Sequence, residues 1–271
     1  MVKSDDRGPR TLSAGIGLIS VSEAGQAAEQ GLLCYKSKRD SVGYQRKLAW
    51  LEQRFEEGPE IRIIREDDRS VGFIEDTPGE FAWRPVHAPG FLFIHCVWVV
   101  GRAKERGYGS HLLNACLEDA RAREKRGVAM LAKKGRHLVG KKLFLNHGFK
   151  SIDRGPLSFE LLAKAFPDDP APTRPYDWEE RQAHYGDGLT VLYANQCRYF
   201  DEAVRTGLEV ADEVGVEECR AVTLNSAQEV QDLAPCPYGT LCIVYDGQLL
   251  AYTPLSAKKL KQRLEEQLAG G

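Results

Sequence analysis

The chain has 271 residues, of which 42% are hydrophobic and 28% charged, and its formal net charge is -2. This length suits one large domain or two modest ones, each able to bury a core. The near-neutral charge gives no reason to expect a nucleic acid or a membrane as partner, and no run approaches the roughly 20 apolar residues of a membrane helix. The polar start, MVKSDDRGPR, lacks the apolar core of a secretory signal. Seven cysteines without a CxxC pair indicate neither a disulfide framework nor a metal site, so we expect a reduced, cytoplasmic protein.

The N-terminal part of the chain combines strand, helix and loop patterns. Leu48, Leu51 and Phe55 share one helical face, and Gly58-Pro59 ends that helix. Alternating residues on both sides of Asp67-Asp68 predict a hairpin. The predicted elements are a strand over 15–21, a helix over 31–55, strands over 61–65 and 70–75, and a proline-rich loop over 77–89.

The central stretch predicts a buried strand, a glycine-rich turn and a helix in immediate succession. The strand is the apolar run over 91–100, the turn is KERGYG over 104–109, and the helix covers 110–124. This arrangement directs unpaired backbone N–H groups at an anion, and Gly107 and Gly109 allow a phosphate to come close. The spacing alone is also typical of an ordinary tight turn.

The remaining patterns predict the end of one domain, a linker and a second domain. Proline and acidic residues in PDDPAPTRP leave almost nothing to bury, which is typical of a linker. Before it we expect a strand over 127–132, a helix over 140–146 and a strand over 157–166. After it we expect strands over 189–193, 218–224, 241–245 and 249–253, and helices over 200–214, 226–233 and 256–268, the last one capped by Ser256.

The central stretch resembles the acyl-CoA motif of the GCN5-related N-acetyltransferases (GNATs). Val99 and Lys104-x-x-Gly107-x-Gly109 fit that motif, with Lys104 standing where the family usually has Arg or Gln. The resemblance implies acetyl-CoA as co-substrate and a backbone N–H of Val99 or Val100 as oxyanion donor. It assigns these residues to acetyl-CoA binding: Val99, Val100, Lys104, Arg106, Gly107, Tyr108, Gly109, Ser110 and Asn146.

His95 is the candidate general base. Several GNATs carry a Glu or His four or six residues before the motif valine, which here are His95 and Phe93. Alternation along a strand predicts that residues 93, 95, 97 and 99 share one face and that Cys96 lies on the other, as a small core residue. An unperturbed imidazole pKa near 6.5 suits a base at neutral pH. The alternative is a core histidine that is hydrogen-bonded to the backbone.

Two further positions bear on acid catalysis and on the acceptor. The family tyrosine that protonates the departing CoA thiolate corresponds to Phe144. The alternatives are Asn146, His147, Tyr108 or water as the acid, or a reaction that requires no acid. The loop before the central strand carries Trp83 and Arg84. An aromatic residue beside an arginine suits an acidic or aromatic acceptor, whereas a loop tryptophan is also typical of a lid over the core.

The second domain resembles thioredoxin-like domains through LYANQCRYF after its first strand. Phe200 replaces the second active-site cysteine, so Cys197 has no CxxC partner. The proline that is usually cis in that fold corresponds to Pro235 or Pro237. The pairing of the two domains, together with IHCVWV, FLNHGF and APCPYGT, resembles the YoaP-like acetyltransferases.

We therefore predict an α/β (α+β) chain. A GNAT mixed sheet flanked by helices covers 1–166, a proline-rich linker covers 167–185, and a smaller thioredoxin-like α/β domain covers 186–271. The predicted function is acetyl transfer from acetyl-CoA to an amine of a small molecule or peptide. The alternatives are a non-catalytic acyl-CoA-binding regulator and a thiol-linked protein that uses Cys197.

Overall fold

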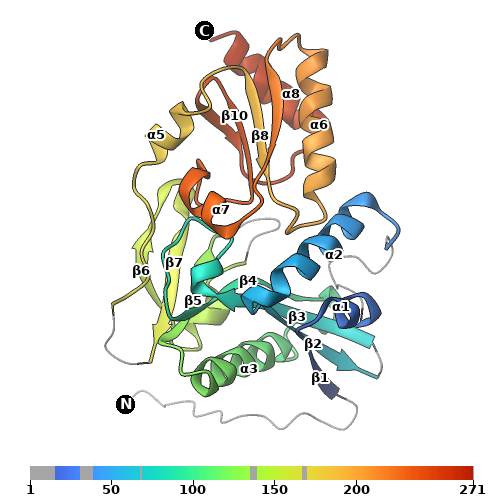
Figure 1. The fold of residues 1–271 in the computed structure, drawn as a ribbon, viewed down its shortest axis with the longest axis vertical. Helices are drawn as coiled ribbons and strands as arrows, with labels where there is room; N and C mark the ends of the chain where they lie inside the picture. Colours follow the sequence, from blue (N-terminus) through green and yellow to red (C-terminus); the bar gives the residue numbers. More distant parts are fainter. Residues whose placement is uncertain (1–15, 31–38, 68, 135–138, 167–169, 271) are drawn as a thin grey trace.

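The computed structural model describes residues 16–30, 39–67, 69–134, 139–166 and 170–270, and it has two parts, one above the other in Figure 1. The first part is built on a seven-stranded sheet in the order β1-β2-β3-β4-β5-β7-β6. Its strands are β1 (Ile16–Val21), β2 (Glu60–Glu66), β3 (Arg69–Pro78), β4 (Phe91–Val99), β5 (Gly127–Ala132), β6 (Lys150–Arg154) and β7 (Glu160–Ala165). Neighbours pair antiparallel except β4 and β5, which are parallel.

The helices of the first part cover opposite faces of this sheet. One face packs on α3 (Tyr108–Ala122), through a core that also holds Phe144 of α4 (Lys142–Leu145). The other face packs on α2 (Val42–Arg54), which follows the short α1 (Ala24–Gln30). In Figure 1, α3 lies below the sheet, and α2 lies above it, toward the second part.

The second part is a four-stranded sheet in the order β11-β10-β8-β9, with β8 and β9 parallel and the other pairs antiparallel. Its strands are β8 (Leu189–Tyr193), β9 (Cys219–Thr223), β10 (Leu241–Tyr245) and β11 (Gln248–Ala251), and its helices are α5 (Trp178–Ala183), α6 (Phe200–Glu213), α7 (Ala227–Leu233) and α8 (Ala257–Leu268). Ser226 caps α7 by accepting the Glu229 N–H, whereas Ser256 precedes α8 without a side-chain cap.

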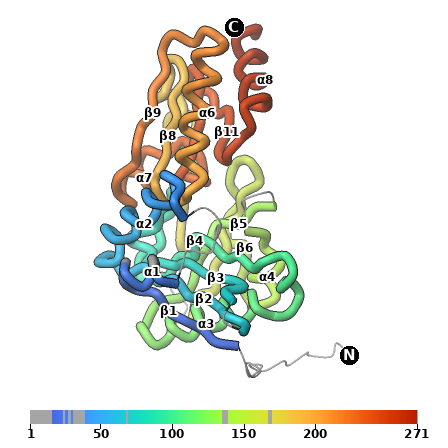
Figure 2. Tube along the Cα trace, turned by 90° about the vertical axis from the view of Figure 1, so that its right-hand side faces the viewer, coloured from blue at the N-terminus to red at the C-terminus, as the bar shows by residue number. Residues whose placement is uncertain are grey.

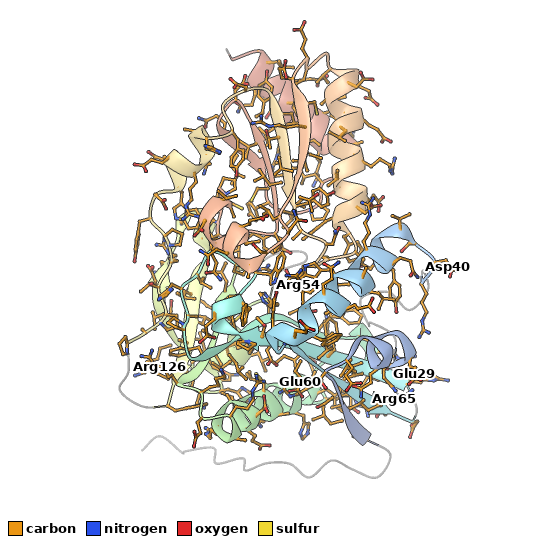
Figure 3. All side chains as sticks on the ribbon, viewed as in Figure 1. Glu29, Asp40, Arg54, Glu60, Arg65 and Arg126 are labelled. Carbon is orange, nitrogen blue, oxygen red and sulfur yellow. The ribbon has the colours of Figure 1, made fainter. Side chains whose placement is uncertain are left out.

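A single apolar core joins the two parts. Buried residues of α2, β2 and β3 form one cluster with residues of β8, α6 and β10. Figures 1 and 2 both place α2 against the start of α6, where Arg46 of α2 forms an ion pair with Asp201. The sheet of the first part is therefore covered on one face by a helix of its own and by the second part.

The predicted fold class is confirmed, and the departures in single elements have local causes. The strand predicted over 127–132 has the observed bounds of β5. The helix predicted over 31–55 begins at Val42 among the described residues, and positions 31–38 lie outside them. β3 runs on to Pro78, into the predicted loop, because β4 pairs with it along that length.

Three α-helices or strands arise where none was predicted, and the first of them is α1 (Ala24–Gln30). β6 lacks an apolar alternation and exists because β7 pairs with it. Within the predicted linker, α5 forms around Trp178, which is only 7% exposed. The predicted domain boundaries therefore stay a prediction. None of the helices in the described part of the chain combines the length and the apolarity needed to cross a bilayer.

Candidate active site

β4 and β5 separate halfway along β4. The two strands pair from Phe91 with Gly127 to Ile94 with Met130. Beyond Ile94, β4 continues beside β3 alone, while β5 continues beside β7 to Ala132. Among the described residues, the later half of β4 thus has no strand on its β5 side. Its N–H and C=O groups on that side are open to a ligand.

This geometry distinguishes the two predicted oxyanion donors. The N–H of Val100 donates to Val71 O of β3 at 2.9 Å and therefore points away from β5. Successive N–H groups of a strand point to opposite edges, so the N–H of Val99 points to the open side. Val99 has the orientation that an oxyanion donor at this opening needs.

The turn after β4 ends in a helix start with free amides. A 3₁₀ turn over Gly101–Ala103 leads to Gly107, which precedes α3 with φ of 84°. Within the described residues, the N–H groups from Arg106 to Ser110 have no hydrogen-bond acceptor, and the first turn of α3 holds no acidic residue. These amides and the positive end of the helix dipole form a site for an anion.

Glu66 of β2 holds the side chains of this turn. Arg106 Nη1 donates to Glu66 Oε2 at 2.8 Å, and the Tyr108 hydroxyl donates to Glu66 Oε1 at 2.7 Å. The hydrogen bonds from Arg106 and Tyr108 lower the pKa of Glu66. Because both side chains are engaged, the backbone amides are left to hold an anion, with Lys104 exposed and Ser110 half-buried beside them.

His95 sits at a β-bulge. Glu75 of β3 is opposite Cys96, and the next residue, Asp76, is opposite Ile94, so His95 is the extra residue of β4. At a bulge the extra residue has no partner on the neighbouring strand, and the alternation of side chains between the two faces is interrupted there. His95 lies beside Phe93 with ring centroids 5.3 Å apart.

The bulge overturns the predicted faces of β4. Val97 and Val99 pack with Ile94 against the α3 core, on the opposite side from Phe93. Cys96 instead packs in the core that joins the two parts. The prediction that residues 93, 95, 97 and 99 share one face is therefore wrong, because an extra residue reverses the alternation after it.

The contacts of His95 match those of a histidine bonded to the backbone. Its Nε2 accepts the Trp83 N–H at 3.3 Å, which assigns the proton to Nδ1, and the buried Nδ1 has no partner among the described residues. Burial, with the charges of Arg84 and Lys47, lowers its pKa well below the usual value. The ring is therefore neutral at pH 7, but it is a weaker base than an ordinary imidazole.

The side chains that could act as the acid differ in their exposure and in the hydrogen bonds that they already make. Phe144 is fully buried against Phe149, with ring centroids 5.3 Å apart. The hydroxyl of Tyr108 is bound to Glu66, and burial raises its pKa. His147 Nδ1 lies 2.8 Å from Leu143 O, whereas Asn146 is exposed directly after α4. Of the three predicted side chains, only that of Asn146 is exposed.

Trp83 and Arg84 lie between the two parts of the chain. Trp83 is 1% exposed and packs edge-on against Trp50 of α2, with ring centroids 4.9 Å apart. Arg84 Nη1 donates to Gln196 Oε1 and Thr240 Oγ1, each at 2.9 Å. Both side chains thus contact protein, and the burial of Trp83 matches the alternative of a lid over the core.

A buried ion pair near His95 was not predicted. Lys47 Nζ of α2 donates to Glu75 Oε1 and Oε2 at 3.0 and 2.8 Å, and both residues are nearly inaccessible. Glu75 faces Cys96 across the strands. The signal was Glu75-Asp76 directly after the apolar run VGFI, since adjacent buried charges on opposite faces each need a partner.

Comparison with known proteins identifies the family. Residues 28–149 match the model of the Acetyltransferase (GNAT) family. The chain is also 30% identical over 224 residues to the Uncharacterized N-acetyltransferase YoaP of Bacillus subtilis (strain 168), covering 80% of this chain and 86% of the relative. The chain therefore belongs to the GNAT acetyltransferase family, which confirms the predicted enzyme class.

Solved GNAT structures resemble the chain over more than half of its length. A GNAT acetyltransferase from Brucella melitensis in complex with acetyl-CoA is 19% identical and covers 59% of this chain and 97% of its own, with a TM-score of 0.38. The PaiA N-acetyltransferase from Thermoplasma acidophilum in complex with coenzyme A is 12% identical. It covers 55% of this chain and 99% of its own, with a TM-score of 0.41.

Proposed function

We propose that this chain transfers the acetyl group of acetyl-CoA to an amine of a small molecule or peptide. The observation that carries the proposal is the row of free amides from Arg106 to Ser110, placed directly after the opening between β4 and β5. An anion cradle beside an unpaired strand edge suits a long ligand with a phosphate at one end and a thioester at the other. Membership of the GNAT family supports the same co-substrate.

The backbone orients the donor and stabilises charge. Amides of Gly107, Tyr108 and Gly109 would hold the pyrophosphate, and Lys104 and Asn146 would contribute side chains at the two ends of the site. The amine nitrogen attacks the thioester carbonyl, and the Val99 N–H stabilises the oxyanion that forms. Collapse of this intermediate breaks the C–S bond, forms the amide and releases CoA.

His95 is the proposed base for the amine proton. Nε2 carries the lone pair, and it must exchange its 3.3 Å bond from the Trp83 N–H for a bond to the amine or to a bridging water. The exchange leaves the buried Trp83 N–H without this acceptor, which costs about 1–3 kcal/mol unless a water takes the place of Nε2. Trp83 and Arg84, the residues predicted to contact the acceptor, are buried at the junction of the two parts.

The second part is proposed to be thioredoxin-like and without CxxC chemistry. Its strand order, its parallel β8-β9 pair and its antiparallel hairpin support this fold. Two features depart from the resemblance. Phe200 occupies the position of the second cysteine and is buried, and the described peptide bonds, including those before Pro235 and Pro237, are all trans.

A charge placed in the cradle tests the proposal. Ser110→Glu puts a carboxylate in the first turn of α3. There it interacts favourably with the helix dipole but repels a pyrophosphate. Calorimetry of the full chain should show acetyl-CoA binding weakened at least tenfold in Ser110→Glu, and less in the uncharged Ser110→Gln. Gly101→Ala is the control for folding, since a Cβ there meets no atom within 4 Å.

Turnover is measured beside binding, as release of CoA on a panel of amines. Equal affinity in the parent and Ser110→Glu would contradict the cradle. Tight binding in the parent with no CoA release on any amine would contradict acetyl transfer and leave the non-catalytic regulator.

A further inference from the structure

Two buried thiols meet in the second part of the chain. Cys236 precedes β10 and Cys242 lies within it, and neither side chain is accessible to solvent. Their Sγ atoms are 2.7 Å apart, and both cysteines are free. A disulfide has an S–S length of about 2.05 Å, so a shift of about 0.7 Å would join them.

The backbone between them is folded to make this approach. Gly239 N–H donates to Cys236 O at 3.1 Å, and Thr240 N–H donates to Tyr238 O at 2.9 Å. Gly239 has φ of 77°, and a Cβ there would come within 2.7 Å of Pro85 Cδ. This tight turn returns the chain onto itself, so that Cys236 comes beside the strand that carries Cys242.

The two sulfur atoms have different environments. Burial disfavours the thiolate form of both cysteines. At Cys236, hydrogen bonds from the Cys242 thiol and from the N–H groups of Gly239 and Tyr238 outweigh burial and lower the pKa. At Cys242, burial dominates and the pKa is raised well above its usual value. Cys236 is thus the better nucleophile of the two thiols.

We propose that Cys236 and Cys242 are an oxidisable pair that peroxides convert to a disulfide. Local opening of the segment first admits hydrogen peroxide to the buried pair. The Cys236 thiolate attacks one oxygen of the peroxide, the O–O bond breaks, and a sulfenic acid and hydroxide form. Cys242 Sγ then attacks Cys236 Sγ, the S–O bond breaks, and water leaves with the thiol proton. In sum, two thiols and one peroxide give one disulfide and two waters. This modification is independent of acetyl transfer.

The pair lies in the segment that holds Arg84. The Arg84 guanidinium stacks over the Tyr238 ring at 4.6 Å from its centroid, and Thr240 accepts a hydrogen bond from it. A bond between Cys236 and Cys242 would covalently join the two ends of the segment that carries Tyr238 and Thr240. The site differs from Cys197, which precedes α6, where Phe200 replaces the CxxC partner.

Peptide mapping of the full chain tests the proposal. Trypsin releases both cysteines in one peptide, residues 221–258, which holds no other cysteine. After hydrogen peroxide, and alkylation in denaturant, this peptide should carry no alkyl group and weigh less by two hydrogen atoms. Dithiothreitol before alkylation should restore two alkyl groups.

Two variants provide the controls. Cys219→Ser, which removes a partly buried cysteine of the same part, should keep the cross-link. Cys242→Ser should lose it and leave a sulfenic acid at Cys236 that dimedone traps. The proposal is overturned if the peroxide-treated parent still takes two alkyl groups in this peptide, if Cys236 oxidises further without a cross-link, or if either cysteine bonds to Cys197 instead.

Discussion

At the scale of single residues, His95 has a contact that competes with the role proposed for it. Its Nε2 accepts a backbone N–H from Trp83, while its Nδ1 has no partner among the described residues. A residue that only positions Trp83 needs an acceptor at Nε2. A base also needs a group that can take up a proton. Glutamine supplies the first property and lacks the second.

We expect His95→Gln to lower turnover by about 10² to 10⁴ and to leave acetyl-CoA affinity nearly unchanged, because a general base acts in the chemical step. The pKa of His95 lies well below its usual value, so the rate of the parent should be flat from pH 6.5 upward and fall only at lower pH. Steady-state kinetics across pH gives both quantities. If His95→Gln keeps the parental rate and His95→Ala does not, His95 positions Trp83.

Asp76 predicts how stability depends on pH. It is fully buried beside Arg62, which also pairs with Glu60 and Asp119. One guanidinium cannot balance three carboxylates, and burial raises the pKa of Asp76 to about 7. The folded state therefore binds this proton more tightly than the unfolded state, whose aspartate has a pKa near 3.9. Its stabilising contribution is present below about pH 4 and is lost as the pH rises through 7.

We expect the unfolding free energy of the parent to fall between pH 4 and 7 relative to that of Asp76→Asn, by at most about 4 kcal/mol. Urea unfolding at several pH values measures this difference. Asp212→Asn, on the exposed side of α6, should follow the parent. A difference between parent and Asp76→Asn that stays constant from pH 4 to 7 would show that Asp76 does not titrate in this range.

At the scale of elements, α2 connects the two parts by a close backbone approach. A Cβ on Gly43 of α2 would lie 2.1 Å from Arg198 O, which precedes α6. Alanine favours a helix over glycine by about 1 kcal/mol where space allows. Gly25 of α1 offers that space, since a Cβ there meets no atom within 4 Å.

Gly43→Ala should lower the unfolding free energy by about 1–3 kcal/mol, because the added methyl group clashes with Arg198 O and pushes α2 away from the second part. Gly25→Ala should be neutral or raise it by up to about 1 kcal/mol. Denaturant unfolding of both variants measures the contrast. A stabilised Gly43→Ala would mean that α2 and the Arg198 segment are not in contact in solution.

At the scale of the whole molecule, the two sheets share one apolar core. The cluster runs from α2 and β3 through Trp83 to β8 and β10, and Arg84 adds hydrogen bonds across it. Unfolding either part alone would expose the apolar core that it shares with the other, so we expect the two parts to unfold together.

We expect a single unfolding transition, in which the curves from tryptophan fluorescence and from far-UV circular dichroism coincide. Arg84→Met fills similar space but leaves Gln196 and Thr240 without their donor. It should lower the unfolding free energy by about 1.5–3 kcal/mol and shift both probes together. Two separate transitions in the parent would contradict the shared core.

Local patterning along the chain was sufficient to predict several features. The apolar run after Gly90, the turn with Gly107 and the start of α3 were predicted, because apolar periodicity and glycine are read within one segment. The order of elements in the second part followed in the same way. Family motifs added the enzyme class.

Other features depend on contacts between segments and could not be predicted from local patterns. The bulge at His95 arises from the register of β3 against β4, and no pattern within β4 contains it. Burial of Trp83 and Arg84 depends on where the second part docks. The approach of Cys236 to Cys242 depends on a turn that packs on Pro85. Each depends on packing between segments far apart in the chain, as Gly239 on Pro85 illustrates, and no pattern within one segment contains it.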